Sequence, residues 1–326
     1  MHYNPVAATL LAAGTLSPAF TYAQETANYP SKPVRIIVGL AAGGAADIQS
    51  RIFASRLSET FGRQFIVENR PGVGSALAFS MVAKAAPDGH TLLAALPIFT
   101  YAAALQKDLA VDPIKDFAPV SLLSKTPWLL VVHPSLPAKS VRELVALAKA
   151  KPGALNFGGG GLGSGTHLVG AWFIHAANIK AQYIPYTRGT GQSTIDLVGG
   201  HIDASIVTVL TVKPFTDTGR LRILGISTAQ RSKIFPDIPT IAEQGVPSYD
   251  SFQFLGWAAT AGTPPAIVNR LSVELAKIAR SSEMEEKIKD DGGEAIGSTP
   301  EQFKQFMAAE VPRWSKLIRD IGLKLE

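Results

Sequence analysis

The sequence predicts an α/β fold with two lobes, each a mainly parallel sheet flanked by helices, and a hinge between them. Residues 34–47 have the pattern of a β-branched strand, a loop of small residues and the start of a helix. Residues 154–176 repeat that order around a run of glycines. Strands alternate with helices around both segments, which is typical of parallel sheets covered by helices.

The length and composition are those of a folded chain large enough for two domains. It has 326 residues, of which 46% are hydrophobic and 17% are charged. The formal charge of +5 comes from dispersed Lys and Arg residues, which indicates modest attraction for anions and no nucleic-acid partner. The absence of cysteine excludes disulfides, thiolate zinc sites and cysteine nucleophiles.

The N-terminus has the pattern of a signal peptide. An apolar run at 6–16 is too short for a transmembrane helix, which needs about 20 residues. Thr21 and Ala23 then stand at the −3 and −1 positions of a signal-peptidase site. We therefore expect residues 1–23 to be a signal peptide and the mature chain to be exported.

The first lobe is predicted to begin with a strand that starts at Val34 and a helix at about 48–61. The elements that follow are a strand at 64–68, a turn at 69–74, a helix at 75–86 and a strand at 91–95. A strand-rich connection at 117–133 leads to a helix at 140–149, whose Ser140 and Glu143 fit a capping box. The second lobe then has strands at 154–157, 182–186, 203–207 and 221–227, with helices at 166–176 and 191–198.

The C-terminal segment is expected to return to the first lobe. It has a strand at 252–260 and helices at 265–281 and 300–321, and no further strands follow for these helices to cover. The predicted lobes are therefore 24–127 plus 249–326, and 128–248. The crossings near 128 and 248 fall in extended segments that suit hinges.

Both small-residue loops are predicted to bind anions. Gly43, Gly44, Ala45 and Ala46 leave the first N–H groups of the following helix accessible, and the helix dipole adds positive potential there. The glycine loop at 158–165 has the same design, and both loops follow the carboxyl ends of strands, where ligands of α/β folds bind. Asp47 either caps its helix or orients the preceding loop, and we favour the cap.

Other charged residues are weaker candidates for the site. Arg70, Arg188 and Lys213 are the cationic candidates for a carboxylate clamp, although a lone basic residue is more often a solvated surface group. Asp203 either holds a loop or accepts a bond from ligand or water. We expect a structural role for it.

An enzyme is the alternative function. Gly158, Gly160 and Gly163 satisfy G-x-G-x-x-G, but no acidic residue lies between Glu143 and Asp196 to bind a ribose. Ser164 stands where a P-loop requires Lys. It also lacks the flanking glycines of a nucleophile elbow, so a helix cap or a hydroxyl donor is the favoured role.

The histidines do not indicate a metal site, because those at 90, 133, 167, 175 and 201 never fall at H-x-x-x-H spacing. His167 lies in the first turn of its helix. We interpret it as a structural hydrogen-bonding group, with ligand contact or pH sensing as the alternatives. No cofactor is expected.

The chain resembles the periplasmic solute receptors of tripartite tricarboxylate transporters, also called Bug proteins, over essentially its whole mature length. The blocks that carry the resemblance are Tyr29-Pro-Ser-Lys-Pro-Val-Arg-Ile-Ile-Val38, Gly43-Gly-Ala-Ala-Asp47, Val67-Glu-Asn-Arg-Pro-Gly72, Ala83-Lys-Ala-Ala-Pro-Asp-Gly89, Ile184-Pro-Tyr186, Asp196-Leu-Val-Gly-Gly200, Phe235-Pro-Asp-Ile-Pro-Thr-Ile-Ala-Glu243 and Gly262-Thr-Pro264.

The resemblance implies a monomeric, non-enzymatic periplasmic-binding-protein fold that closes on a carboxylate and delivers it to large and small membrane subunits. Backbone N–H groups and ordered water of two loops would hold the carboxylate. The residues carried over by motif are Leu40, Ala42, Gly44, Ala45, Ala46, Asp47, Pro97, Ile98, Gly160, Gly161, Gly163, Ser164, Gly165, Thr166, Arg188, Asp203 and Val207.

Departures from the family pattern bear on the ligand. Small or apolar residues stand at Leu40, Ala45, Ala46 and Ile98, and Val207 stands where many relatives have Asp. These changes would widen the cleft and remove an acidic partner for an ammonium group. The prediction is an aromatic or otherwise apolar-bodied carboxylate such as terephthalate.

Overall fold

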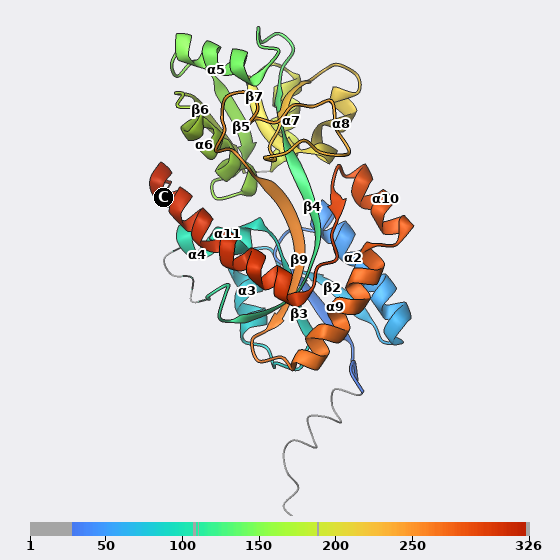
Figure 1. Ribbon diagram of the computed structural model, residues 1–326. Helices are drawn as coiled ribbons and strands as arrows, with labels where there is room; N and C mark the ends of the chain where they lie inside the picture. Colours follow the sequence, from blue (N-terminus) through green and yellow to red (C-terminus); the bar gives the residue numbers. More distant parts are fainter. Residues whose placement is uncertain (1–27, 107–108, 110, 188, 324–326) are drawn as a thin grey trace, which may run out of the picture.

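The computed structural model describes residues 28–106, 109, 111–187 and 189–323. The predicted signal peptide and Arg188 therefore lie outside the described residues. The predicted α/β fold with two lobes is confirmed, and a mixed sheet runs through both lobes (Figure 1). Its strands follow the order β2-β1-β3-β9-β4-β7-β5-β6, and β8 and β10 both pair with β4.

The first lobe combines parallel and antiparallel strands. Strand β1 (Val34–Val38) lies parallel to β2 (Phe65–Asn69) and β3 (Thr91–Ala95). Strands β9 (Phe252–Thr260) and β10 (Glu294–Ala295) add antiparallel pairs. The helices of this part of the chain are α2 (Ala45–Phe61), η1 (Val73–Ser75), α3 (Ala76–Ala83), α4 (Pro97–Leu105), α9 (Pro265–Ala279), α10 (Ser282–Asp290) and α11 (Pro300–Ile321).

The second lobe repeats this mixture. Strand β5 (Asn156–Gly160) lies parallel to β6 (Gln182–Tyr186) and β7 (Ala204–Thr208), whereas β7 and β8 (Arg222–Ile226) are antiparallel to β4. The helices of this lobe are α5 (Val141–Ala150), α6 (Gly165–Ala176), α7 (Thr190–Val198) and α8 (Val209–Thr216).

Strand β4 (Phe117–Val132) is shared by the two lobes, and together with β9 it crosses from one to the other (Figure 1). It pairs with β9 as far as Pro127 and with β7 from Trp128 onward. The sheets are mixed rather than mainly parallel because β4 and β9 run in opposite directions through the sheet and add antiparallel pairs on both sides.

Several predicted boundaries differ from the structure. Helix α2 begins at Ala45 rather than at 48, since alanine favours helix and Gly44 serves as the N-cap. Strand β5 continues through the glycines to Gly160. Helices α4, α8 and α10 were not predicted. Two of these are short helices that contain a proline, Pro97 at the start of α4 and Pro214 inside α8.

Helix α11 packs on the first lobe, as expected, and also contacts the second lobe. Phe303 and Met307 of its first half are buried in the core of the first lobe. Trp314 and Ile318 of its second half are buried in the core of the second lobe, where the rings of Trp314 and Trp172 lie 5.6 Å apart. A capping box between Thr299 and Gln302 fixes the start of the helix.

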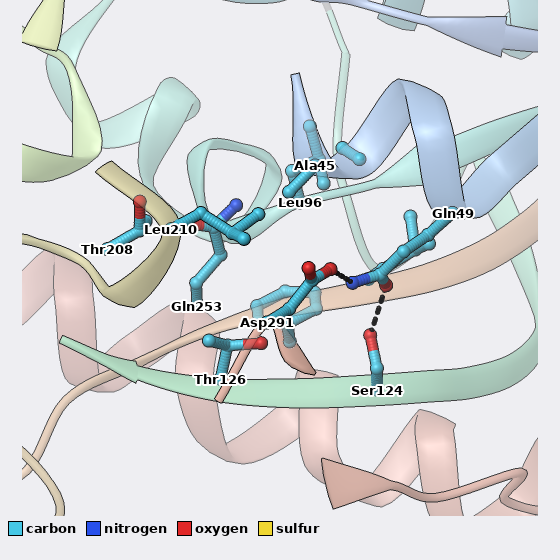
Figure 2. A pocket seen from close by; sticks show the side chains of 12 residues that line it. Ala45, Gln49, Leu96, Ser124, Thr126, Thr208, Leu210, Gln253 and Asp291 are labelled. Atoms are coloured by element: carbon cyan, nitrogen blue, oxygen red, sulfur yellow. Dashed lines mark hydrogen bonds between the residues drawn. The ribbon is translucent and has the colours of Figure 1, made fainter. Parts of the chain in front are cut away.

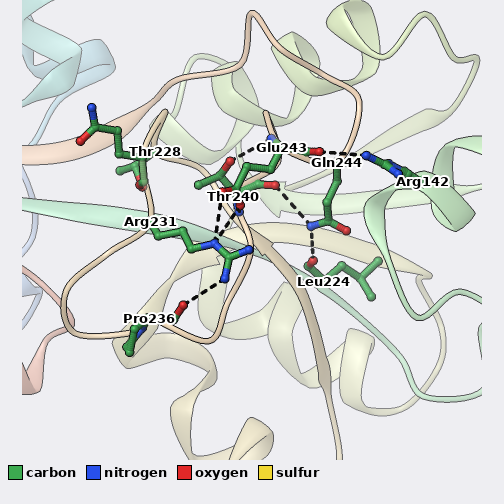
Figure 3. A network of polar contacts seen from close by, with 9 residues as sticks. Arg142, Leu224, Thr228, Arg231, Pro236, Thr240, Glu243 and Gln244 are labelled. Atoms are coloured by element: carbon green, nitrogen blue, oxygen red, sulfur yellow. Dashed lines mark hydrogen bonds and ion pairs between the residues drawn. The ribbon is translucent and has the colours of Figure 1, made fainter.

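The segment between β8 and β9 is held on the second lobe by a polar network (Figure 3). Thr240 and Glu243 exchange backbone-to-side-chain hydrogen bonds of 2.9 Å, and Arg231 Nε lies 3.0 Å from the Glu243 carboxylate. Gln244 Nε2 donates to the Leu224 carbonyl at 2.8 Å. These contacts give the Phe235–Glu243 block of the sequence a structural role.

Candidate functional site

A cleft of about 750 Å³ lies between the two lobes. Its walls come from the loop that precedes α2, the start of α4, the loop that precedes α6, and the starts of α7 and α8. Asp47 is the single charged side chain among the described residues that line it. The cleft is therefore formed mainly by backbone, small side chains and apolar groups.

The loop before α2 is shaped by the buried side chain of Asp47. Gly43 N–H donates to Asp47 Oδ2 at 2.9 Å, and Arg51 Nη2 lies 3.0 Å from Asp47 Oδ1. Burial alone would raise the pKa of Asp47, but hydrogen bonds from Arg51, Gly43 N–H and Asn69 hold that pKa below its usual range. Asp47 thus orients the loop, and the favoured prediction that it caps the helix is wrong, because Gly44 is the N-cap.

The N-terminus of α2 offers backbone donors to the cleft. Ala45, Ala46 and Asp47 occupy the first three positions of the helix, where N–H groups have no carbonyl partner within the helix. All three residues line the cleft. The helix dipole adds positive potential at the same point, so this end of the cleft can hold an anion.

The loop before α6 is shaped by neutral side chains. Ser164 is the N-cap, and its Oγ accepts from His167 N–H at 3.2 Å. Thr166 Oγ1 accepts from Gly160 N–H at 2.8 Å, and His167 Nδ1 accepts from Gly163 N–H at 3.0 Å. The N–H groups of Gly160 and Gly163 are thus used inside the loop, and those of Gly165 and Thr166 at the helix start face no helix carbonyl.

The structural interpretation of His167 is confirmed. Its ring is buried, accepts the Gly163 bond and lies 4.6 Å from the ring of Tyr183. Burial lowers the pKa of His167, so the ring is neutral at pH 7. The Tyr183 hydroxyl in turn donates to the Gly160 carbonyl at 3.0 Å and secures the loop.

Most residues predicted for the site line one cleft. They are Leu40, Ala42, Gly44, Ala45, Ala46, Asp47, Pro97, Ile98, Gly160, Gly161, Ser164, Gly165 and Thr166. Gly163 lines an adjacent pocket of about 220 Å³ that shares Leu40, Ile98, Gly161 and Ser164 with the cleft.

Four other predicted candidates line neither the cleft nor this adjacent pocket. Val207 is fully buried in a core with Leu129 and Val212, so it does not widen the cleft. The Asp203 carboxylate accepts from Asn156 N–H at 2.8 Å, at the end of β5 opposite the glycine loop. Arg70 and Lys213 form exposed ion pairs with Glu68 and Asp217.

Several residues of the cleft lining were not predicted from the sequence. Tyr101 lies in α4, which was not predicted, and Trp128 lies in the strand that crosses between the lobes. Neither has a sequence motif that would have marked it. Polar residues of the lining that were not predicted include Thr190, Thr211 and Gln253.

A small pocket opens beside the cleft (Figure 2). Its volume is about 20 Å³, which is room for a single water molecule. Gln49 joins its two sides, because its Nε2 donates to Asp291 at 2.9 Å and its Oε1 accepts from Ser124 Oγ at 2.8 Å. Burial raises the pKa of Asp291 above its usual range, against the lowering effect of the Gln49 bond. The Asp291 carboxyl group is thus hydrogen-bonded to Gln49 and does not line the main cleft.

Two features are absent from the part of the chain that the structure describes. No group of three or more His, Asp or Glu side chains in residues 28–106, 109, 111–187 and 189–323 could hold a metal ion. Within the same residues, no helix is long and apolar enough to cross a membrane.

Comparison with known proteins identifies the family. The model of the family described as "Tripartite tricarboxylate transporter family receptor" matches residues 49–323. Protein BugT of Bordetella pertussis is 33% identical over 305 residues, which are 92% of this chain and 92% of that protein.

Solved structures agree with this match. Rpa4515 of R. palustris with adipate has a TM-score of 0.80 and 32% identity, covering 91% of this chain and 99% of that chain. MatC from Rhodopseudomonas palustris with bound malate has a TM-score of 0.78 and 29% identity, covering 89% and 100%. The two-lobed fold, the cleft and the match over most of the chain lead to one conclusion: this chain belongs to the solute-binding receptors of the tripartite tricarboxylate transporter family.

Proposed function

We propose that the protein captures a small carboxylate between its two lobes and delivers it to the large and small membrane subunits of a tripartite tricarboxylate transporter. The observation that carries the proposal is the pair of helix N-termini, α2 and α6, that line one cleft. Each presents N–H groups that have no carbonyl partner within the helix, together with a favourable dipole. Such groups bind carboxylates without a cationic side chain.

The favoured ligand is an aromatic or otherwise apolar-bodied dicarboxylate such as terephthalate. Asp47 is already bound to Gly43 and Arg51. The described lining of the cleft therefore has no free carboxylate that could pair with the ammonium group of an amino-acid ligand. Leu40, Leu96 and Ile98 offer apolar contacts for the body of the ligand. Two related structures contain adipate and malate, and both molecules are dicarboxylates, which supports a ligand with two carboxylate groups.

Capture requires the lobes to close on the ligand. We take 24–127 with 249–326 as one lobe and 128–248 as the other. The crossing near 128 coincides with the change of strand partners within β4 at Pro127 and Trp128, where a small backbone rotation would move one lobe against the other. The exported, monomeric receptor then works in the periplasm, next to its membrane subunits.

A binding protein accounts for the site better than an enzyme does. Ser164 Oγ accepts from the backbone N–H of His167, and the ring of His167 accepts from Gly163. The imidazole is therefore not placed as a base for Ser164. Capture needs neither a cofactor nor a metal ion.

The test is a thermal-shift and calorimetric screen of residues 24–326 against aliphatic, amino and aromatic carboxylates. Ligands that bind the folded state raise the melting temperature by mass action. We expect terephthalate and related dicarboxylates to raise it and aspartate to leave it unchanged. Binding of aspartate or citrate without any response to aromatic carboxylates would contradict the ligand class, and a response to nucleotides alone would contradict the receptor function.

A further inference from the structure

Two aromatic side chains lie beside the N-terminus of α6. Tyr101 of α4 and Trp128 of β4 both line the cleft, and only 1% and 5% of their surfaces are exposed. A Cβ atom added to Gly165 would lie 3.3 Å from Trp128 Cη2, 3.4 Å from Trp128 Cζ2 and 3.6 Å from the Tyr101 hydroxyl. The edge of the indole ring and the end of the phenol ring therefore lie on the side of Gly165 where a side chain would stand.

Both side chains carry a hydrogen-bond donor that the described part of the protein does not use. Trp128 Nε1 is buried and has no partner among the described residues. The Tyr101 hydroxyl likewise forms no hydrogen bond within that part of the chain, where its polar end lies near Gly165. Burial raises the pKa of Tyr101, so its hydroxyl keeps its proton at pH 7 and remains a donor.

Comparable groups elsewhere in the core do have partners. Trp314 Nε1 donates to Glu310 at 3.0 Å, and the Tyr249 hydroxyl donates to the Val169 carbonyl at 2.9 Å. Buried Tyr and Trp side chains normally find such partners, because an unpaired buried donor is unfavourable. Trp257 Nε1 is also unpaired, but Trp257 lies in the core of the first lobe and does not line the cleft.

We propose that Tyr101 and Trp128 hold one carboxylate of the ligand at the α6 end of the cleft. The carboxylate oxygens would accept from the phenol hydroxyl and the indole N–H as well as from the backbone N–H groups of Gly165 and Thr166. This inference rests on the proposed function and assigns one end of the ligand to two specific side chains. The opposite end of the ligand would lie at the N-terminus of α2.

The substitution Tyr101→Phe removes the donor and keeps the ring. We expect the dissociation constant for terephthalate, and for adipate as an aliphatic probe, to rise about tenfold or more, since a hydrogen bond to a charged group is lost. The melting temperature of the ligand-free protein should stay the same or rise, because the hydroxyl has no partner to lose. A structural role for the hydroxyl would instead lower the melting temperature.

The substitution Trp128→Phe tests the second donor, with Trp257→Phe as the matched control. Both remove a buried indole N–H that is unpaired, but only Trp128 lines the cleft. We expect Trp128→Phe to weaken binding of terephthalate about tenfold or more and Trp257→Phe to leave it unchanged.

A direct readout comes from the indole N–H signals in a ¹H–¹⁵N spectrum of the intact mature protein. The chain has 4 tryptophans, so each signal can be assigned from its Trp→Phe variant. Saturating terephthalate should move the Trp128 signal downfield and leave the Trp257 signal in place. If terephthalate binds but the Trp128 signal and the affinities of both cleft variants do not change, the assignment of these side chains is wrong. If the wild-type protein binds none of the carboxylates, the proposed function fails, and this inference fails with it.

Discussion

The loop before α2 and the loop before α6 face the same cleft, but different groups hold them. One buried carboxylate, Asp47, accepts from Gly43 N–H and pairs with Arg51 in the first loop. In the second loop the neutral groups of Ser164, Thr166 and His167 accept from three backbone N–H groups. The shape of the first loop thus depends on a charged side chain, and the shape of the second loop depends on hydrogen bonds to uncharged side chains.

The glycines of the two loops also serve different purposes. A Cβ atom added at Gly43 or Gly44 would meet nothing within 4 Å. A Cβ atom at Gly158 would lie 2.2 Å from Ile202 Cδ1, and one at Gly159 would lie 2.3 Å from the Tyr183 hydroxyl. Glycine keeps the first loop open to a ligand, whereas in the second loop it allows the strand to pack against its neighbours.

The largest effect is expected for Gly159→Ala. The added methyl group would displace the Tyr183 hydroxyl and break its bond to the Gly160 carbonyl. Overpacking and the lost bond should lower the free energy of unfolding by about 2–4 kcal/mol, measured by urea denaturation. Gly44→Ala is the matched control in the first loop and should unfold at nearly the wild-type urea concentration. Equal losses in both variants would contradict the difference between the loops.

The next largest effect is expected for Asp47→Ala. Removal of the carboxylate leaves Gly43 N–H and Arg51 without their partner, which should cost about 1–3 kcal/mol of unfolding free energy. Affinity for terephthalate should also fall, because the loop loses its fixed shape. Asp217→Ala is the control, since it removes an exposed partner of Lys213 and should cost about 0.5 kcal/mol or less. Denaturation and calorimetry of the two variants would separate these outcomes.

Much of the fold could be predicted from local patterns. The strands at 91–95 and 182–186 have the predicted bounds, and strands were also predicted from Val34 onward and near 252–260, because runs of apolar and β-branched residues end at turn residues there. Strand pairing could not be predicted in the same way. The antiparallel pairs of β4 and β9 depend on contacts between residues far apart in the sequence.

The backbone part of the site could be predicted, and the side-chain part could not. Loops of small residues before helices indicate accessible N–H groups, which the structure places in one cleft. Neighbouring residues of a strand point to opposite faces, so a family position such as Val207 is buried in the core while the next residue, Thr208, lines the cleft. Tyr101 and Trp128 come together only through folding.

Substitution of a glycine by valine should have different effects in the two loops. Gly44→Val places a side chain in the open space of the cleft and should raise the dissociation constant for terephthalate about tenfold, with little loss of stability. Gly163 has φ of +80° and does not line the main cleft, so Gly163→Val should lower stability by about 1–2 kcal/mol. Calorimetry and denaturation of both variants test the contrast. This contrast is contradicted if Gly163→Val lowers the free energy of ligand binding more than it lowers the free energy of unfolding.

A smaller effect is expected for Ser164→Ala. The N-cap bond to His167 N–H is lost, which should lower the free energy of unfolding by about 1 kcal/mol. Affinity for terephthalate should change less than it does in Gly44→Val, since backbone donors rather than this hydroxyl hold the carboxylate. The reverse order of dissociation constants would mean that side chains supply the main contacts.

The smallest expected effect is the pH dependence of stability, which should differ between the two loops. The folded protein holds the pKa values of His167 and Asp47 below their usual values. Each group therefore makes its full contribution to stability at pH values above its unfolded pKa. That contribution is lost as the pH falls. The unfolded values are about 6.5 for His and about 3.9 for Asp. Between pH 6.5 and pH 4.5 the second loop should therefore weaken more than the first. His167→Gln keeps a neutral acceptor for Gly163 N–H and should lose less stability than the wild type over this range. Identical pH slopes for the two proteins would mean that His167 does not weaken the second loop as the pH falls.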